Sequence, residues 1–322
     1  MKILVTGCAG FIGFHLVKKL LNKNYDICGI DNLNSYYDIK LKKDRLAILK
    51  NTSKKKFIFY KVDIANDLKL KKIFKKGNFD IVVNLAAQAG VRYSIENPRA
   101  YVDSNIIGFF NILQNSKIFG IKHLLFASTS SVYGNQKKMP IHEECSIIRP
   151  IQFYAATKSS NELMAYSYSH LFKLQCSALR FFTVYGPWGR PDMALFKFTK
   201  NILSNKPINV YNFGKHSRDF TYVEDVVNAI SLIINGNKKR NTYEVFNIAN
   251  GKSEKLGKYI SLIEKEVNIK AIKNFLPLQI GDIQKTFANT NKIRKFTNFK
   301  SQTDIAIGIS NFVSWYRSYY KV

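Results

Sequence analysis

Three glycines near the start of the chain, Gly7, Gly10 and Gly13, most strongly limit what it can fold into. They follow a short apolar run, Lys2–Thr6, and open a helical pattern over Ile12–Leu21. In such a junction the first glycine permits a sharp turn, the second lets backbone N–H groups approach a pyrophosphate, and the third lets helix pack closely on strand. The start of the helix adds partial positive charge for the phosphates. The spacing therefore predicts a dinucleotide-binding turn.

Acidic residues after the next two predicted strands indicate which dinucleotide binds. The second strand ends at Asp31, where a carboxylate can accept hydrogen bonds from the hydroxyls of an adenosine ribose. The same carboxylate would repel a 2′-phosphate, so NAD is favoured over NADP. Asp63, after the third strand, is placed to bond the adenine amine.

Short apolar runs alternate with helical patterns through the first two-thirds of the chain. The runs are nearly continuous in apolar residues, as in parallel strands covered by helices on both faces. They are Lys2–Thr6, Asp26–Ile30, Phe57–Val62, Asp80–Leu85, Leu124–Ser128 and Cys176–Phe182. This alternation predicts an α/β fold built on a doubly wound parallel sheet, a Rossmann fold.

The pattern changes beyond about Gly186, where helical stretches are separated by short strands. These segments are Ala194–Ser204, Ile208–Tyr211, Val223–Ile234, Glu244–Ile248, Leu256–Val267 and Ile305–Tyr316. We predict a nucleotide-binding domain over residues 1–183, with a returning segment at about 219–250. A smaller α/β substrate domain over residues 184–322 would pack directly on it and leave a cleft for ligands.

A tyrosine and a lysine four residues apart, Tyr154 and Lys158, begin another predicted helix and share one of its faces. A neighbouring ammonium lowers the pKa of a phenol from about 10, which makes the tyrosine a usable base near neutral pH. Upstream, four hydroxyl residues, Ser128–Ser131, lie at the carboxyl end of a predicted strand. Parallel sheets of this kind bind ligands at the carboxyl ends of their strands. These residues predict a site that moves a proton.

Composition limits the class of partner and the compartment. Lys+Arg 50 against Asp+Glu 22 gives a net charge of +28, but the basic residues are scattered and form no long tail. We expect this charge to attract anionic small molecules rather than nucleic acid. The cysteines Cys8, Cys28, Cys145 and Cys176 lie far apart, so neither a metal site nor a disulfide framework is expected. Reduced thiols, a first strand beginning at Lys2 and the lack of any apolar run near 18 residues predict a cytoplasmic protein without a signal peptide or membrane span.

With these motifs the chain resembles the extended short-chain dehydrogenase/reductase family. Within that family it is similar to the NAD-dependent nucleotide-sugar epimerases, most of all to the UDP-glucuronate 4-epimerases, over nearly its whole length. The glycine-rich turn and the Tyr154–Lys158 pair mark the superfamily, whereas Ala89–Ser94 and Phe181–Pro191 are more specific. The other matching segments are Asp31-Asn32, Asp63-Ile64, Asn84–Gly90, Asn105, Ser128–Gly134, Arg218–Phe220 and Gly281-Asp282.

The resemblance implies a role for each matching residue. Tyr154 would be the catalytic base, Lys158 would tune it and hold the nicotinamide ribose, and Thr129 would bond the reacting C4 oxygen. Arg218 would hold the diphosphate and Asp282 the uridine ribose. The implied cofactor-binding residues are Gly7, Gly10, Phe11, Ile12, Gly13, Asp31, Asn32, Asp63, Ile64, Leu85, Ala86, Ala87, Asn105, Tyr154 and Lys158. The implied substrate-binding residues are Arg92, Thr129, Ser130, Ser131, Thr183, Arg190, Arg218 and Asp282, and no metal is expected.

The nature of the sugar depends on the loop around Thr183. Galactose-type members of the family usually carry Asn at that position. Thr183 and Arg190, with Ser130 and Ser131, look suited instead to a sugar carboxylate. The implied reaction is 4-epimerisation of UDP-glucuronate to UDP-galacturonate through a 4-keto intermediate, with tightly held NAD, supplying a bacterial polysaccharide.

Other interpretations stay open at this point. A UDP-glucose or UDP-N-acetylglucosamine 4-epimerase shares all but the Thr183/Arg190 pocket, and a UDP-glucuronate decarboxylase shares the substrate. Relatives that bind nucleic acid would be expected to lose the Tyr154–Lys158 pair or Arg218, both of which remain here. The predicted helices Asn105–Ile118 and Tyr154–Leu171 could form a four-helix interface in a homodimer, as in the family.

Overall fold

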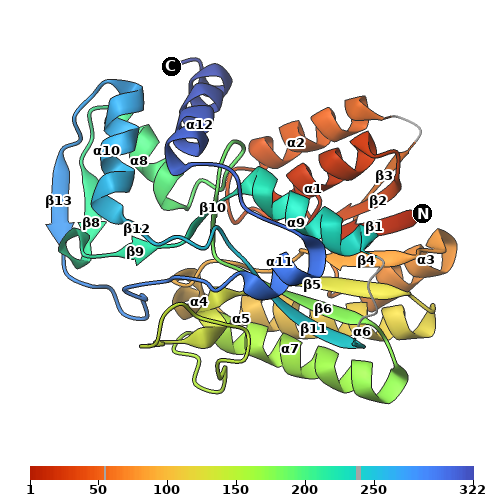
Figure 1. The fold of residues 1–322 in the computed structure, drawn as a ribbon. Coiled ribbons are helices and arrows are strands. Elements are labelled where there is room, and N and C mark those ends of the chain that lie inside the picture. The colour runs from red at the N-terminus through yellow and green to blue at the C-terminus, as the bar shows by residue number, and fades with distance from the viewer. Residues whose placement is uncertain (54–55, 237–240) are drawn as a thin grey trace.

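The centre of the molecule is a seven-stranded parallel sheet (Figure 1). The structure, a computed structural model, describes residues 1–53, 56–236 and 241–322. The order of the strands reverses at β1, which pairs with β2 on one side and with β4 on the other, and such a reversal leaves a crevice at the carboxyl ends of the strands. In spatial order the strands are β3 (Phe57–Lys61), β2 (Asp26–Asp31), β1 (Lys2–Thr6), β4 (Ile81–Asn84), β5 (His123–Thr129), β6 (Cys176–Phe181) and β11 (Tyr243–Ile248).

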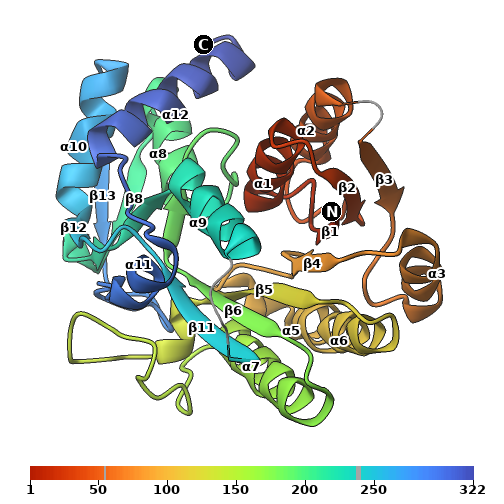
Figure 2. The same ribbon diagram turned by 45° about the vertical axis from the view of Figure 1, so that its right-hand side comes forward.

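Helices cover both faces of this sheet (Figure 2). One face carries α1 (Phe11–Asn22), α2 (Ile39–Thr52), α9 (Val223–Asn235) and α11 (Asn291–Thr297). The other carries α3 (Asp67–Gly77), α6 (Gly108–Ile118) and α7 (Phe153–Phe172). Two apolar layers result, which explains why the strands are apolar on both sides.

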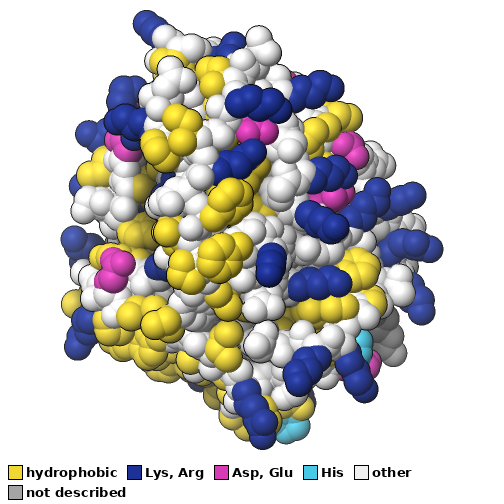
Figure 3. Space-filling model, turned by 90° about the vertical axis from the view of Figure 1, so that its left-hand side faces the viewer, with side chains coloured by type: hydrophobic (Ala, Val, Ile, Leu, Met, Phe, Trp, Pro, Cys, Tyr) yellow, Lys and Arg dark blue, Asp and Glu magenta, His cyan; other side chains and the backbone are white. Residues whose placement is uncertain are grey.

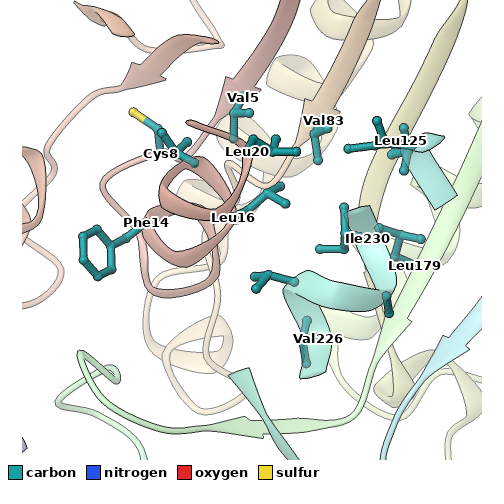
Figure 4. Packing of buried hydrophobic residues seen from close by; sticks show 14 of the residues in the cluster. Val5, Cys8, Phe14, Leu16, Leu20, Val83, Leu125, Leu179, Val226 and Ile230 are labelled. Atoms are coloured by element: carbon teal, nitrogen blue, oxygen red, sulfur yellow. The ribbon is translucent and has the colours of Figure 1, made fainter. Parts of the chain in front are cut away.

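The apolar layer under α1 and α9 holds the glycine-rich turn in place (Figure 4). Leu16 and Leu20 of α1 and Ile230 of α9 pack with Val5 and Val83 of the central strands, and all five side chains are fully buried. Burial of an aliphatic side chain contributes about 1.5–3 kcal/mol. The start of α1 is therefore held rigidly against the end of β1.

A second group of elements lies beyond the carboxyl ends of the sheet, on the left of Figure 1. Its own apolar core joins α8 (Ala194–Leu203), α10 (Leu256–Val267) and α12 (Ile305–Tyr320). Three two-stranded pairs complete it: β7 (Thr183–Tyr185) with β10 (Phe220–Tyr222), β8 (Ile208–Tyr211) with β13 (Lys273–Leu276), and β9 (Ser217–Arg218) with β12 (Glu254–Lys255).

The predicted fold class and the predicted central strands are confirmed, because each apolar run forms a strand of the parallel sheet. The predicted helix Asn105–Ile118 differs at its start, where a π-helix, η1 (Val102–Ile107), precedes α6. Such i→i+5 turns are often found at functional sites. Short elements complete the fold: α4 (Tyr93–Glu96), α5 (Pro98–Tyr101), η2 (Ser130–Tyr133) and η3 (Asn212–Gly214).

Charged side chains are spread over the surface. Figure 3 shows the face that carries β8, β13 and α10, with Lys and Arg side chains distributed among hydrophobic ones. Among the helices in the described parts of the chain, none has the length and apolar character needed to span a bilayer.

Candidate active site

A cavity of about 970 Å³ lies at the carboxyl ends of the central strands. One part of its wall is the glycine-rich turn with the ends of β2 and β4, and the opposite part comes from β8, β9 and α8. Tyr154, Thr129 and Thr183 lie along the wall between these two parts. A cavity of this volume has room for a dinucleotide and a second ligand.

The glycine-rich turn presents bare backbone to this cavity. Gly10 is the N-cap of α1, and no side chain caps its first turn. The Gly10 N–H donates to the Gly7 carbonyl oxygen at 2.9 Å, which closes the turn. A Cβ on Gly13 would run into that same carbonyl oxygen. A helix start without a side-chain cap and without room for a Cβ is suited to bind a phosphate.

The carboxylate of Asp31 lies at the end of β2 beside this turn. It accepts hydrogen bonds from the Leu33 N–H at 2.8 Å and from the Ala9 N–H at 3.1 Å. Burial raises the pKa of Asp31, while these N–H groups and the cations Lys42 and Arg45 oppose the rise. Next to it, Asn32 donates to Asp63 at 2.8 Å.

Tyr154 and Lys158 extend from the first turns of α7 into the middle of the cavity. Burial raises the pKa of Tyr154, but the charge of Arg190 and a hydrogen bond with Thr129 pull it down. Lys158 is 2% exposed, and its ammonium donates to the Ala127 carbonyl oxygen at 2.9 Å. Burial lowers the pKa of Lys158 to about 8, although the carboxylate of Glu162 opposes this.

Asn105 lies behind the cavity rather than in its wall. Its side chain accepts from the Gln88 N–H at 2.9 Å and donates to the Thr157 hydroxyl at 3.0 Å. Its backbone carbonyl oxygen accepts from Asn161 at 2.6 Å. Asn105 therefore ties the segment after β4 to α7, the helix that carries Tyr154.

Arg218 and Asp282 meet at the far end of the cavity. Nη2 of Arg218 lies 3.3 Å from the Asp282 carboxylate, and Nη1 donates to the Gln284 carbonyl oxygen at 2.9 Å. His216 lies 3.5 Å from the other oxygen of Asp282. The Arg92 guanidinium, also in the lining, lies over the ring of Tyr211, 4.6 Å from its centre.

Arg190 enters the cavity from the loop after β7. Its Nε and Nη2 donate to the two carboxylate oxygens of Asp192 at 2.9 and 2.5 Å. The hydroxyl of Tyr36, from the loop after β2, donates to the same carboxylate at 3.2 Å. Thr183 also lines the cavity, and its N–H donates to the Asp219 carbonyl oxygen at 3.1 Å.

Most of the residues singled out in the sequence lie together around this one cavity. Asn105, Ser130 and Ser131, all within the described chain, are not in its lining. Ser130 and Ser131 turn away in η2, where the Thr129 hydroxyl accepts from the Ser131 N–H at 3.2 Å. The predicted residues that do line it are Gly7, Gly10, Phe11, Ile12, Gly13, Asp31, Asn32, Asp63, Ile64, Leu85, Ala86, Ala87, Arg92, Thr129, Tyr154, Lys158, Thr183, Arg190, Arg218 and Asp282.

Several polar residues of the lining were not predicted from the sequence. They include Tyr36, Lys42, Asp192, Tyr211 and His216. Asp192 could have been found from its position two residues after Arg190, because opposite charges that close often pair in a loop. Tyr36 carries no such signal, since its partner lies far away in the sequence.

Comparison with known proteins places the chain in a family. The sequence profile of the NAD dependent epimerase/dehydratase family matches residues 3–249. The chain is 49% identical to the Protein CapI of Staphylococcus aureus over all of both chains. It is 42% identical to a UDP-glucuronate 4-epimerase of Thermodesulfobacterium geofontis over 97% of this chain and 95% of that protein. A crystal structure of UDP-glucuronic acid 4-epimerase from Bacillus cereus with UDP-glucuronic acid and NAD is 34% identical and matches with a TM-score of 0.93, over 99% of this chain and 100% of that one. The chain therefore belongs to the NAD-dependent epimerase/dehydratase family.

Proposed function

We propose that this protein is a UDP-glucuronate 4-epimerase, which interconverts UDP-glucuronate and UDP-galacturonate with NAD as a bound cofactor. The observation that carries the proposal is that one cavity holds the glycine-rich turn, the Tyr154–Lys158 pair and Arg190 with Thr183. The similarity to relatives and structures named for this activity supports it.

The residues at the nucleotide end fit NAD. The pyrophosphate would lie on the uncapped start of α1, and the Asp31 carboxylate, which already accepts two N–H groups, would accept from the adenosine ribose. Asp63 would bond the adenine amine. When bound, NAD supplies reversible acceptance of a hydride from C4 of the sugar.

Tyr154 would act as the general base on the 4-hydroxyl. The hydrogen bond from Thr129 and the charge of Arg190 both lower the pKa of its phenol, which offsets part of the effect of burial. Thr129 would also orient the reacting oxygen. After the 4-keto sugar turns over in the cavity, return of the hydride to the opposite face of C4 would restore the alcohol, and Tyr154 would return the proton to the C4 oxygen.

Turning of the sugar requires one end of the substrate to stay fixed. Arg218 would hold the diphosphate and Asp282 the uridine ribose, at the end of the cavity away from Tyr154. The ion pair between them gives the anchor a fixed geometry before substrate arrives. The cavity of about 970 Å³ leaves space for rotation at the other end.

The sugar carboxylate requires control because a 4-keto derivative of glucuronate is a β-keto acid. Loss of carbon dioxide requires the C5–C6 bond to align with the carbonyl π system, so an epimerase must hold that bond near the carbonyl plane. Thr183 and Arg190 would hold the carboxylate there. Ser130 and Ser131 lie outside the cavity wall. They could bind the carboxylate only if η2 moved.

The experiment is incubation of the purified protein with UDP-glucuronate, UDP-glucose and UDP-N-acetylglucosamine, followed by chromatography. UDP-galacturonate should be the main product, and the neutral sugars should react poorly. Preference for a neutral sugar would assign a UDP-glucose-type epimerase, and UDP-xylose as the main product would assign a decarboxylase.

The cofactor itself is tested by recovering nucleotide from the protein. The purified protein should release NAD. Asp31→Ala should reduce the preference for NAD over NADP, because the carboxylate that repels a 2′-phosphate is gone. Asp26→Ala, at the exposed start of β2 and outside the cavity lining, also removes a carboxylate and serves as the control. Recovery of NADP from the wild type would contradict the assignment.

We also propose a homodimer formed through α6 and α7. These helices lie side by side, joined by a 2.9 Å hydrogen bond from the Tyr168 hydroxyl to Gln114. They expose large apolar side chains, among them Phe110 at 45%, Leu163 at 65% and Tyr166 at 58%. Apolar residues at this spacing on two neighbouring helices are suited to pack on the same pair of helices in a second copy.

The cysteines support a reducing compartment, for which we propose the cytoplasm. All four are free thiols, and Cys8, Cys28 and Cys176 are buried. Burial raises the pKa of Cys28 and of Cys176 to about 12, so both stay protonated and unreactive.

A further inference from the structure

Three loops that are distant in the sequence meet around the guanidinium of Arg190. Asp192, in the same loop as Arg190, binds it at two points, through Nε at 2.9 Å and Nη2 at 2.5 Å. Tyr36, from the loop after β2, donates its hydroxyl to Asp192 at 3.2 Å. Gly90, from the segment after β4, lies against that hydroxyl, and a Cβ there would overlap it. We call Tyr36, Asp192 and Arg190 the arginine clamp.

The clamp is built into the fold rather than formed by chance on a flexible surface. Gly90 has φ +108, which side-chain-bearing residues rarely adopt, and so leaves room for Tyr36. The ring of Tyr36 packs on Tyr93 at 4.8 Å. The loop that carries Arg190 is held by the fully buried Arg45, whose guanidinium donates to the Trp188 carbonyl oxygen at 2.6 Å.

Arg45 also links this loop to the nucleotide end of the cavity. The same guanidinium donates to the Ala9 carbonyl oxygen, in the glycine-rich turn, at 2.8 Å. The loop that carries Arg190 and Asp192 is therefore tied to the glycine-rich turn. Arg190 is near enough to Tyr154 for its charge to lower the pKa of the phenol.

Two-point pairing limits what Arg190 can do for a ligand. Nε and Nη2 form the side of the guanidinium that matches a carboxylate, and Asp192 already uses both. Asp192 takes one N–H of each, so an acidic sugar must either bind the remaining N–H groups of Nη1 and Nη2 or compete with Asp192. The carboxylate of Asp192 also lines the cavity and repels an incoming anion.

We propose that Asp192, held by Tyr36, is a positioning residue that fixes Arg190 and limits how strongly it pulls on the carboxylate of an acidic sugar. The inference rests on the proposed function and assigns a purpose to residues outside the base and the anchor. With Arg190 fixed, the sugar carboxylate is oriented but not tightly bound, so the sugar ring stays free to turn over. Without Asp192, the acidic sugar should bind more tightly but react more slowly.

The first test measures binding in the Tyr154→Phe background, which cannot turn over, with NAD present. Calorimetry should show that Asp192→Asn binds UDP-glucuronate about threefold to tenfold more tightly, because a charge-assisted bond is gained and a repulsion is lost. Binding of UDP-glucose, which has no carboxylate, should not change. Tyr36→Phe keeps every charge and should move binding in the same direction by a smaller factor.

The second test measures turnover in enzyme that keeps the native Tyr154. Asp192→Asn should lower kcat for UDP-glucuronate by about tenfold while KM falls, a combination that loss of folding does not produce. It should also move the acidic limb of the pH profile to lower pH, because Arg190 then acts on the phenol without its counter-charge. Arg190→Gln should move the same limb to higher pH.

The matched control is Asp44→Asn. Asp44 likewise lies between a cation and a tyrosine, Lys40 at 2.6 Å and the Tyr319 hydroxyl at 2.5 Å, but it is outside the cavity lining. Asp44→Asn should leave binding, kcat and the pH profile unchanged.

The inference is overturned if Asp192→Asn weakens binding of both sugars equally. It is also overturned if the acidic limb of the pH profile stays in place in both Asp192→Asn and Arg190→Gln. Failure of the wild type to convert UDP-glucuronate would instead overturn the proposed function. The two failures are distinguishable, because the binding comparison between acidic and neutral sugars needs no turnover.

Discussion

At the scale of single residues, Tyr154 is the group on which the proposed chemistry most depends. Tyr154→Phe removes the hydroxyl but keeps the ring that packs on Tyr101 at 6.0 Å. Substrate binding should stay within about threefold, whereas turnover should fall by about 10²–10⁴-fold, the usual contribution of a general base. Rates should be measured near neutral pH with binding by calorimetry; a near-normal rate would mean that another residue removes the proton.

Lys158 leads to a prediction about stability. Burial lowers its pKa from 10.5 to about 8, so between these values the folded protein binds fewer protons than the unfolded chain. Below about pH 8 the buried ammonium lowers the free energy of unfolding by its full amount. This effect disappears as the pH rises toward the pKa of the unfolded chain. Lys158→Met should therefore raise the free energy of unfolding near neutral pH, by no more than about 3 kcal/mol, and the gain should shrink in alkaline buffer.

Chemical denaturation of nucleotide-free protein at neutral and alkaline pH checks this sign. Lys72→Met, at an exposed lysine of α3, serves as the control and should be neutral at both. A gain from Lys158→Met that is equal at every pH would show that the buried ammonium is not its cause. The same variant should be almost inactive, which illustrates stability given up for function.

At the scale of the element, the junction of β1 and α1 allows no side chain at Gly13. A Cβ there would meet the Gly7 carbonyl oxygen, and that atom is backbone and cannot rotate away. Gly13→Ala should cost about 1–3 kcal/mol, as overpacking does, and the protein should lose its bound nucleotide. Gly257→Ala on α10 meets nothing within 4 Å and should be neutral or stabilising by up to about 1 kcal/mol.

Denaturation curves and the nucleotide released on unfolding measure both variants. Equal nucleotide content in Gly13→Ala and Gly257→Ala would show that the turn tolerates a side chain, contrary to the packing. Loss in both would point to a general defect rather than to the junction.

At the scale of the whole molecule, assembly depends on the exposed apolar side chains of α6 and α7. Leu163→Glu combined with Phe110→Glu places charges where the proposed partner helices would pack, and the dimer should dissociate into folded monomers. Light scattering coupled to gel filtration gives the mass. Leu68→Glu, on the 77% exposed leucine of α3, should leave the mass unchanged, and a monomeric wild type would contradict the proposed interface.

The sequence by itself determined the parts of this protein that depend on neighbours along the chain. The apolar runs predicted the parallel strands, because strands covered on both faces are mostly apolar, and the spacing of Gly7, Gly10 and Gly13 predicted the turn. The i, i+4 spacing of Tyr154 and Lys158 likewise placed both on one side of α7.

Tertiary structure decided which side chains meet across loops. Asn105 follows the expected motif, yet it lies outside the cavity lining, bonded to Gln88 and Thr157. Arg190 was predicted to bind a sugar carboxylate, but packing also brings Asp192 and Tyr36 onto it. Local patterns set backbone conformation through short-range sterics, whereas these partners are fixed by where separate strand ends converge, which no single stretch of sequence encodes.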